Sequence, residues 1–303
     1  MTWRRGRATV GDYVARDGTR RPIELAYETL GDGTPLLLVM GINAQRIFWD
    51  DRLCARLAAA GFRVIRFDHR DTGESTHLDA PVPRAGRALA RRMVGAAIHA
   101  PYTLSDMAGD VIGLCDHLTI ERAHVVGVSL GGMVGQHLAI EHAPRVRSLV
   151  AIMTATSARR FLPTPRALGA LFAPAPRSVE EAGRHVEQLF RAIGSPVFAH
   201  DAARLRAIGE EAHRRGASPR GFLRQFAAVL ASGDRERALR GVNVPTLVIH
   251  GTRDPLMPIA AGRALARAVP HATWLPLAGM GHHLAEELWD VIARAIARHA
   301  AAA

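Results

Sequence analysis

The chain has 303 residues, of which 48% are hydrophobic and 22% are charged, a composition typical of a globular protein with one large core and a smaller appended layer. Its formal net charge is +11 and all 39 basic residues are arginine, which we interpret as a bias in residue usage rather than as the mark of an anionic partner. The arginines are scattered, and the local cluster of Arg84, Arg87, Arg91 and Arg92 has no interleaved aromatic residues for stacking on bases, so we do not expect nucleic acid as a partner.

The two cysteines, Cys54 and Cys115, each lie in a stretch that has the apolar periodicity of an amphipathic helix. We therefore expect buried thiols rather than a disulfide, which fits a reducing compartment. No cysteine and histidine spacing completes a zinc site, so we expect no metal. The first residues lack the apolar run of a secretion signal, and no stretch reaches the roughly 18 apolar residues that span a bilayer. We expect a cytoplasmic protein without stable membrane insertion.

The first third of the chain begins an alternation of strands and helices. Strand patterns at 8–15 and 22–31 end at a turn rich in glycine, and the apolar run at 34–41 is typical of a strand buried on both faces. A helical pattern at 50–61 and a second buried run at 62–68 follow. This order is typical of a parallel sheet with crossover helices.

The same alternation continues through the rest of the chain, with one interruption. The further predicted elements are helix 104–118, strand 123–129, helix 131–144, strand 146–153, strand 244–251, helix 259–270, strand 272–277 and helix 284–300. Strands that alternate with helices of this length imply right-handed βαβ units, so we predict the α/β class with a mostly parallel, doubly wound sheet.

The alternation stops between residues 154 and 237. This stretch is helical in pattern, carries several prolines and has no buried-strand run, so we predict a helical cap inserted into the sheet domain. The predicted organisation is a core at 1–153 and 238–303 with the cap at 154–237. A separate basic amphipathic helix is expected at 84–100, as a solvated or core-facing helix rather than a membrane-surface one.

The strongest local signal is the sequence GVSLG at 127–131, directly after a predicted strand and before a predicted helix. That context is what a nucleophile elbow requires, with glycines for a sharp turn and Ser129 raised above the sheet edge. The amides at the start of the helix point at a developing anion. The alternative is a glycine-rich turn in which Ser129 only caps the helix.

A serine needs a base, and the base needs an orienting carboxylate. In open α/β sheets reacting groups gather at the carboxyl ends of strands, so we look just past the later strands. Asp254 follows one of them, and His282 or His283 follows the next. The order Ser, Asp, His is the one that this type of sheet requires. We interpret Asp68 and Asp71 as members of a structural turn.

His250, at the end of a predicted buried strand, is interpreted as a core histidine.

At these motifs the sequence resembles the α/β-hydrolases, and among them the esterases similar to aclacinomycin methylesterase. The stretches that carry the resemblance are 36–41, 62–75, 123–132, 244–258 and 279–284. The resemblance implies the α/β-hydrolase fold and assigns nucleophile, acid and base to Ser129, Asp254 and His282. His283 is then expected where the closing helix begins, facing solvent or packed on the cap.

The resemblance also implies an oxyanion hole made of the backbone N–H groups of Leu130 and Ile42. Many members of the family have His-Gly before the loop of the second donor, where this chain has Met40-Gly41. The methylesterase-like group shares the Met-Gly form, and because both donors belong to the main chain, the hole does not depend on that histidine.

The predicted function is hydrolysis of small to medium apolar carboxylic esters through an acyl-enzyme, without metal or cofactor. A C–C bond hydrolase or a cofactor-free perhydrolase uses the same triad, and a non-catalytic ligand-binding sensor is the alternative of another class. Five apolar cap residues are candidates for a substrate pocket, although we expect them rather to form the core of the cap. These are Phe161, Leu162, Leu171, Phe172 and Phe190.

Overall fold

The computed structural model describes residues 2–94, 96–157 and 162–303. Its strands form one eight-stranded sheet in the order β1-β2-β4-β3-β5-β6-β7-β8. The strands are β1 (Arg4–Val14), β2 (Arg20–Leu30), β3 (Thr34–Val39), β4 (Phe62–Phe67), β5 (Ala123–Val128), β6 (Val146–Ile152), β7 (Thr246–Gly251) and β8 (Thr273–Leu277). Only the pairs β1–β2 and β2–β4 are antiparallel, so the predicted, mostly parallel sheet is confirmed.

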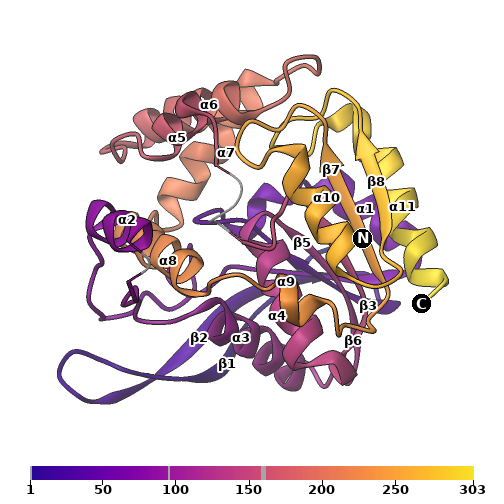
Figure 1. Cartoon of the computed structure of the whole chain (residues 1–303), viewed down its shortest axis with the longest axis horizontal. Helices are drawn as coiled ribbons and strands as arrows, with labels where there is room; N and C mark the ends of the chain where they lie inside the picture. The colour runs from indigo at the N-terminus through magenta and orange to yellow at the C-terminus, as the bar shows by residue number, and fades with distance from the viewer. Residues whose placement is uncertain (1, 95, 158–161) are drawn as a thin grey trace.

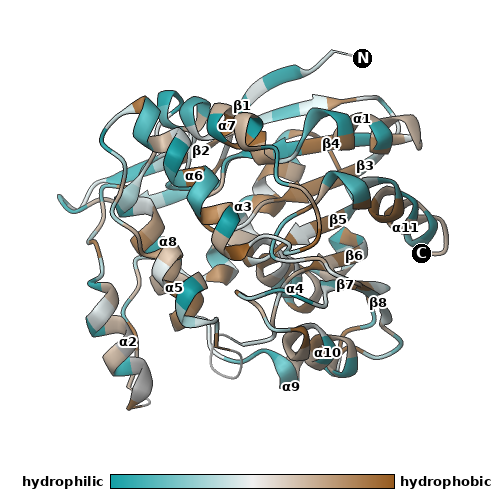
Figure 2. Cartoon of the chain, turned by 90° about the horizontal axis from the view of Figure 1, so that it is seen from above, coloured by the Kyte–Doolittle hydropathy of each residue, from teal (hydrophilic) through white to brown (hydrophobic). Residues whose placement is uncertain are grey.

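Helices cover both faces of this sheet (Figure 1). The helices of the core are α1 (Asp51–Ala59), α2 (Ala85–Met93), α3 (Leu104–His117), α4 (Leu130–Glu141), α10 (Ile259–Ala268) and α11 (Trp289–Ala301). Alternate strand residues face opposite sides: Leu37 and Val125 pack with α3, α4 and α10, whereas Leu36 and Val126 pack with α1 and α11. Figure 2 shows hydrophobic residues concentrated in the central strands. Burial on both faces explains why these strands are continuous apolar runs.

The segment between β6 and β7 carries a set of helices in its described part. It contains α5 (Pro165–Leu171), α6 (Val179–Ile193), α7 (Ala202–Arg214), α8 (Pro219–Ala231) and the short α9 (Glu236–Leu239). We call α5 to α8 and the loops between them the cap. In Figure 1, α5, α6 and α7 lie together on one side of the molecule, and α8 lies close to α2.

Two predicted helices differ from the structure by five residues or more at one end. The helix expected at 84–100 ends at Met93, and the chain then folds back so that the N–H of Ala96 and the side chain of Arg91 both bond across the turn. The closing helix begins at Trp289, after the short 3-10 turn η3 (Glu286–Leu288), rather than at residue 284. The indole N–H of Trp289 donates to the carbonyl of Leu284 at 2.9 Å, a side-chain bond that spans the residues between the predicted and the observed helix start.

Cys54 and Cys115 are free and buried, as expected. Burial raises the pKa of the Cys54 thiol to about 12 and that of Cys115 to about 11, so both stay protonated. Within the described ranges, no helix is both long and apolar enough to cross a bilayer.

Buried ion pairs join the cap to the turn that follows β4. Arg224 of α8 donates to Asp71 Oδ1 at 2.6 Å, and Arg215, directly after α7, donates to Asp68 Oδ2 at 3.2 Å. Both carboxylates are fully buried, and Asp71 has a positive φ of 66°. The structural role predicted for this turn is therefore confirmed.

Replacing Asp71 by alanine is expected to lower the free energy of unfolding by about 3–5 kcal/mol, because the guanidinium of Arg224 is then buried without its carboxylate. Urea unfolding followed by circular dichroism measures this change. Asp32→Ala is the control: it removes an exposed pair with Arg4, and its unfolding midpoint is expected to equal that of the wild type. Equal midpoints for Asp71→Ala and wild type would contradict the prediction.

Candidate active site

Three polar residues lie just past the carboxyl ends of three strands. Ser129 follows β5, Asp254 follows β7 after a short turn, and His282 follows β8 in the loop before η3. Because parallel strands end at the same edge of a sheet, these segments meet there. All three residues are buried, with exposed fractions of 6–7%.

Ser129 lies in a sharp turn between β5 and α4. Its φ is 55° and its ψ is −118°, and its side chain makes no capping hydrogen bond within the described part of the chain. The backbone around it is well fixed: its N–H donates to Ile152 O at 2.9 Å, and Thr154 Oγ1 donates to its carbonyl at 2.8 Å. A buried non-glycine residue in this conformation is strained, and such strain concentrates at functional sites. The interpretation of Ser129 as a capping residue is therefore wrong.

The glycines on either side of Ser129 serve a purpose other than the one expected. We expected them to supply the sharp turn, but the positive φ belongs to Ser129 itself. A Cβ on Gly127 would lie 2.3 Å from the carbonyl oxygen of Gly131, and one on Gly131 would lie 2.0 Å from that of Val39. Glycine is needed here because β3, β5 and the start of α4 approach one another too closely for a side chain.

His282 is oriented by Asp254. Its Nδ1–H donates to Asp254 Oδ2 at 2.7 Å, while Asp254 Oδ1 accepts the backbone N–H groups of Leu256 at 2.9 Å and Met257 at 2.7 Å. The carboxylate is thereby held on both oxygens. With Nδ1 engaged, Nε2 is the ring nitrogen that remains for a group in the adjoining cavity, which is the arrangement that a general base requires.

Ser129 and His282 both line a cavity of about 710 Å³ between the sheet edge and the cap. Its walls are largely apolar. Core residues of the wall include Met40, Ile42, Phe48, Met153 and Leu256, and cap residues include Leu171, Phe172, Ala182, Val186, Leu189, Phe190, Ile193, Leu205, Ile208, Phe222 and Leu223. The space is sufficient for a substrate of small to medium size.

The five apolar cap candidates divide into two groups. Leu171, Phe172 and Phe190 line the cavity, so the expectation that they form only the core of the cap is wrong for these three. The side chain of Leu171 lines the cavity and also packs on the small cap cluster around Ile193. Leu162 is 74% exposed, and Phe161 lies outside the described residues.

The N–H groups of Ile42 and Leu130 are placed as free donors beside Ser129. Among the described residues no hydrogen bond uses either group. Leu130 is the first residue of α4, where N–H groups have no partner within the helix. Ile42 follows Gly41, on which a Cβ would lie 3.4 Å from Ser129 Cβ.

Sequence reasoning missed the residues that shape the loop after β3. Asn43 has a positive φ of 53°, and its N–H donates to Gln225 Oε1 of α8 at 2.7 Å. The buried His69 donates through Nε2 to Met40 O at 3.0 Å, and burial lowers its pKa to about 4. An Asn after Gly-Ile is a local signal for a positive φ, but the contacts of Gln225 and His69 have no sequence signal because they join distant segments.

His283 is packed on the cap, one of the two places expected for it, but it lies in the loop before η3 rather than at a helix start. Its Nδ1 accepts the N–H of Ser195 at 3.1 Å. His250 is fully buried, donates through Nε2 to Met257 O at 2.8 Å, and has its pKa lowered by burial. The interpretation of His250 as a core histidine is confirmed.

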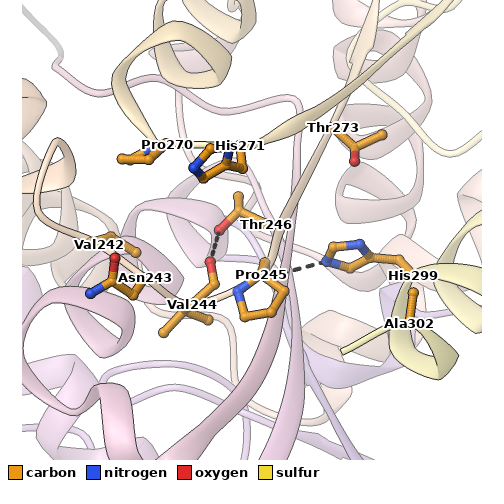
Figure 3. A pocket seen from close by; sticks show the side chains of 10 residues that line it. All are labelled: Val242, Asn243, Val244, Pro245, Thr246, Pro270, His271, Thr273, His299 and Ala302. Atoms are coloured by element: carbon orange, nitrogen blue, oxygen red, sulfur yellow. Dashed lines mark hydrogen bonds between the residues drawn. The ribbon is translucent and has the colours of Figure 1, made fainter.

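A second, smaller depression lies at the opposite edge of the sheet, where β7 and β8 begin (Figure 3). It is lined by residues such as Asn243, Pro245 and His299, and the His299 ring nitrogen Nε2 donates to Pro245 O at 3.2 Å. None of the predicted site residues lines it.

Comparison with known proteins shows similarity along most of the chain. Residues 34–287 match the model of a family described as "alpha/beta hydrolase fold". The sequence is 31% identical to rhodomycin D methylesterase DnrP of Streptomyces peucetius, over 94% of this chain and 97% of the relative. It is 32% identical to RutD of Variovorax paradoxus, provisionally named a carbamate hydrolase, over 89% of this chain and 96% of the relative.

Among solved structures, the fold is similar to that of 2-hydroxy-6-oxo-6-phenylhexa-2,4-dienoate hydrolase from Rhodococcus sp. strain RHA1. The TM-score is 0.73 at 19% identity, and the match covers 98% of each chain. At that identity the likeness concerns the fold alone.

Ser129→Gly is expected to increase stability by about 1 kcal/mol or more, because glycine adopts the observed backbone angles without strain. Ser178 is the matched control, since it lies at the start of α6 with a φ of −134° and caps the N–H of Glu181. Ser178→Gly is expected to lose a few tenths of a kcal/mol. Urea unfolding of both variants measures the difference, and a destabilised Ser129→Gly would show that the turn is not strained.

Proposed function

Since the chain belongs to the α/β-hydrolase family, we propose that it hydrolyses carboxylic esters through an acyl-enzyme intermediate with Ser129, His282 and Asp254 as its triad. The observation that carries the proposal is the Asp254–His282 hydrogen bond of 2.7 Å, because it orients an imidazole that shares a cavity with a strained serine. The similarity to a methylesterase supports the choice of ester as substrate.

In the acylation step, Ser129 Oγ attacks the ester carbonyl carbon while His282 Nε2 takes the hydroxyl proton. The carbonyl oxygen becomes an oxyanion, and the free N–H groups of Leu130 and Ile42 stabilise it. One such donor contributes about 10²–10³ in rate in related chemistry. The tetrahedral intermediate then collapses, the C–O bond to the alcohol breaks, and His282 returns its proton to the departing alkoxide.

In the deacylation step, a water molecule attacks the carbonyl carbon of the acyl-enzyme. His282 Nε2 takes a proton from the water, the same N–H groups stabilise the second oxyanion, and the bond to Ser129 Oγ breaks. The proton passes from His282 to Ser129, and the carboxylic acid leaves. Asp254 stays ionised throughout and stabilises the imidazolium that forms in each half of the reaction.

The proposal also assigns parts of the chain to separate tasks. Residues 1–153 and 238–303 form the core that carries the triad, and the segment at 154–237, which contains the cap, determines which ester is accepted. The apolar cavity walls contributed by the cap favour small to medium apolar substrates. The partner is a small-molecule ester, and the proposed chemistry uses neither a metal nor a cofactor.

Ser129→Ala and His282→Ala are each expected to lower kcat/KM for a p-nitrophenyl ester by about 10⁴ or more, since the members of a triad act as a unit. The matched control is His283→Ala, which is expected to stay within about tenfold of the wild type. A fluorophosphonate is expected to label the wild type and not Ser129→Ala. A wild type that does not label, or a Ser129→Ala variant that retains ester turnover, would refute the proposal.

The length of the acyl chain is expected to change the rate because the cavity is apolar. Burial of each added methylene contributes about 0.8 kcal/mol of free energy. We therefore expect kcat/KM to rise about threefold to fourfold per methylene until the cavity is filled. A series of p-nitrophenyl esters from acetate to decanoate measures this. A flat profile would show that the acyl chain does not enter the cavity.

A further inference from the structure

The loop that carries His282 is bonded to the cap. The N–H of His282 donates to Ile193 O at 2.7 Å, at the end of α6. Two further bonds involve Ser195 in the α6–α7 connection (residues 194–201): its hydroxyl donates to Gly279 O at 2.5 Å, and its N–H donates to His283 Nδ1 at 3.1 Å. The loop is thus fastened to the cap before, at and after the position of His282.

These contacts leave no free space between the two segments. A Cβ on Gly281 would lie 2.2 Å from the carbonyl carbon of Gly194 and 2.5 Å from the nitrogen of Ser195, and a Cβ on Gly279 would lie 2.3 Å from Val197 Cγ2. Glycine at 281 therefore allows the loop to approach the cap backbone directly, and glycine at 279 leaves room for the side chain of Val197. A displacement of the connection must displace the His282 loop as well.

Two imidazoles bond to the backbone of Ser195, one at its N–H and one at its carbonyl. His283 Nδ1 accepts its N–H, and His200 Nε2 donates to its carbonyl at 3.0 Å. The two rings lie with their centroids 4.8 Å apart. Burial lowers the pKa of His283 to about 4, so its ring is neutral near pH 7 and keeps the acceptor that Ser195 requires.

We propose that Ser195 is a positioning residue for the base: its hydroxyl and amide fasten the 279–283 loop to the cap, and the cap thereby sets the place of the His282 ring. The inference rests on the proposed function, in which His282 is the base. Asp254 fixes the rotation of the ring, whereas Ser195 fixes the loop from which the ring extends. The contacts of a substrate with the cap then affect kcat as well as the affinity for the substrate.

The test is a comparison of Ser195→Ala with Ser178→Ala. Both variants remove a cap serine that accepts backbone N–H groups, but only Ser195 also bonds to the His282 loop. We expect Ser195→Ala to lower kcat about tenfold to a hundredfold with KM within about twofold, because a small displacement of a catalytic group has a large effect on rate. Ser178→Ala is expected to keep the wild-type kcat, and Ser195→Thr to restore most of it.

A proton NMR measurement separates this inference from the proposed function. The Nδ1–H that His282 shares with Asp254 gives a low-field resonance, identified by its loss in His282→Ala. We expect Ser195→Ala to shift or broaden this resonance and Ser178→Ala to leave it unchanged. This readout needs no ester, so it remains informative if no ester is turned over.

Unchanged kcat and an unchanged resonance in a folded Ser195→Ala would overturn the inference, as would a change in KM alone. If Ser195→Ala does not fold, a second pair tests the same bond from the other side. His283→Leu removes the acceptor of the Ser195 N–H and is expected to lower kcat, although by no more than about tenfold. His283→Gln, which retains an acceptor, is expected to retain most of the activity. Equal kcat values for the two variants would overturn the inference.

Discussion

The burial of two carboxylates in one turn constrains the whole molecule. Asp68 and Asp71 are completely shielded from water, and a buried charge without a partner is strongly destabilising. Arg46 and Tyr102 of the core bond to these carboxylates, and Arg215 and Arg224 of the cap are two further partners. Two of the cationic partners of these core carboxylates therefore come from the cap, so the ion pairs link the cap to the core beside the cavity.

Two of the proposed catalytic residues are held by different parts of the chain. Ser129 is held by the central strands through bonds to Ile152 and Thr154, and the close approach of Gly131 to Val39 leaves it no freedom. His282, in contrast, belongs to a loop that shares its contacts with the cap. In the proposed mechanism, the nucleophile is therefore positioned by the core and the base by both the core and the cap.

The central strands and the three proposed catalytic residues were predictable from sequence because their signals are local. A strand buried on both faces is a short apolar run, and Ser129 and Asp254 each follow such a run, while His282 follows the edge strand β8; the three come in the order that the sheet requires. The start of the closing helix was not predictable, because a bond from Trp289 back to Leu284 competes with local helix propensity. The contacts of Ser195 have no sequence signal either, since they join segments more than 80 residues apart.

The insertion of the cap between β6 and β7 has a consequence for synthesis of the chain. The parallel pairing of Leu149 with Thr246 joins strands separated by about 90 residues, and the entropy of closing a loop rises only slowly with its length. The insertion therefore costs little free energy at equilibrium. It does affect folding during synthesis, because β6 is made well before β7. Until β7 leaves the ribosome, β6 is an apolar edge strand without its neighbour, and such edges pair readily with other chains. The nascent protein thus exposes the edge of β6 during the time in which the ribosome translates the cap.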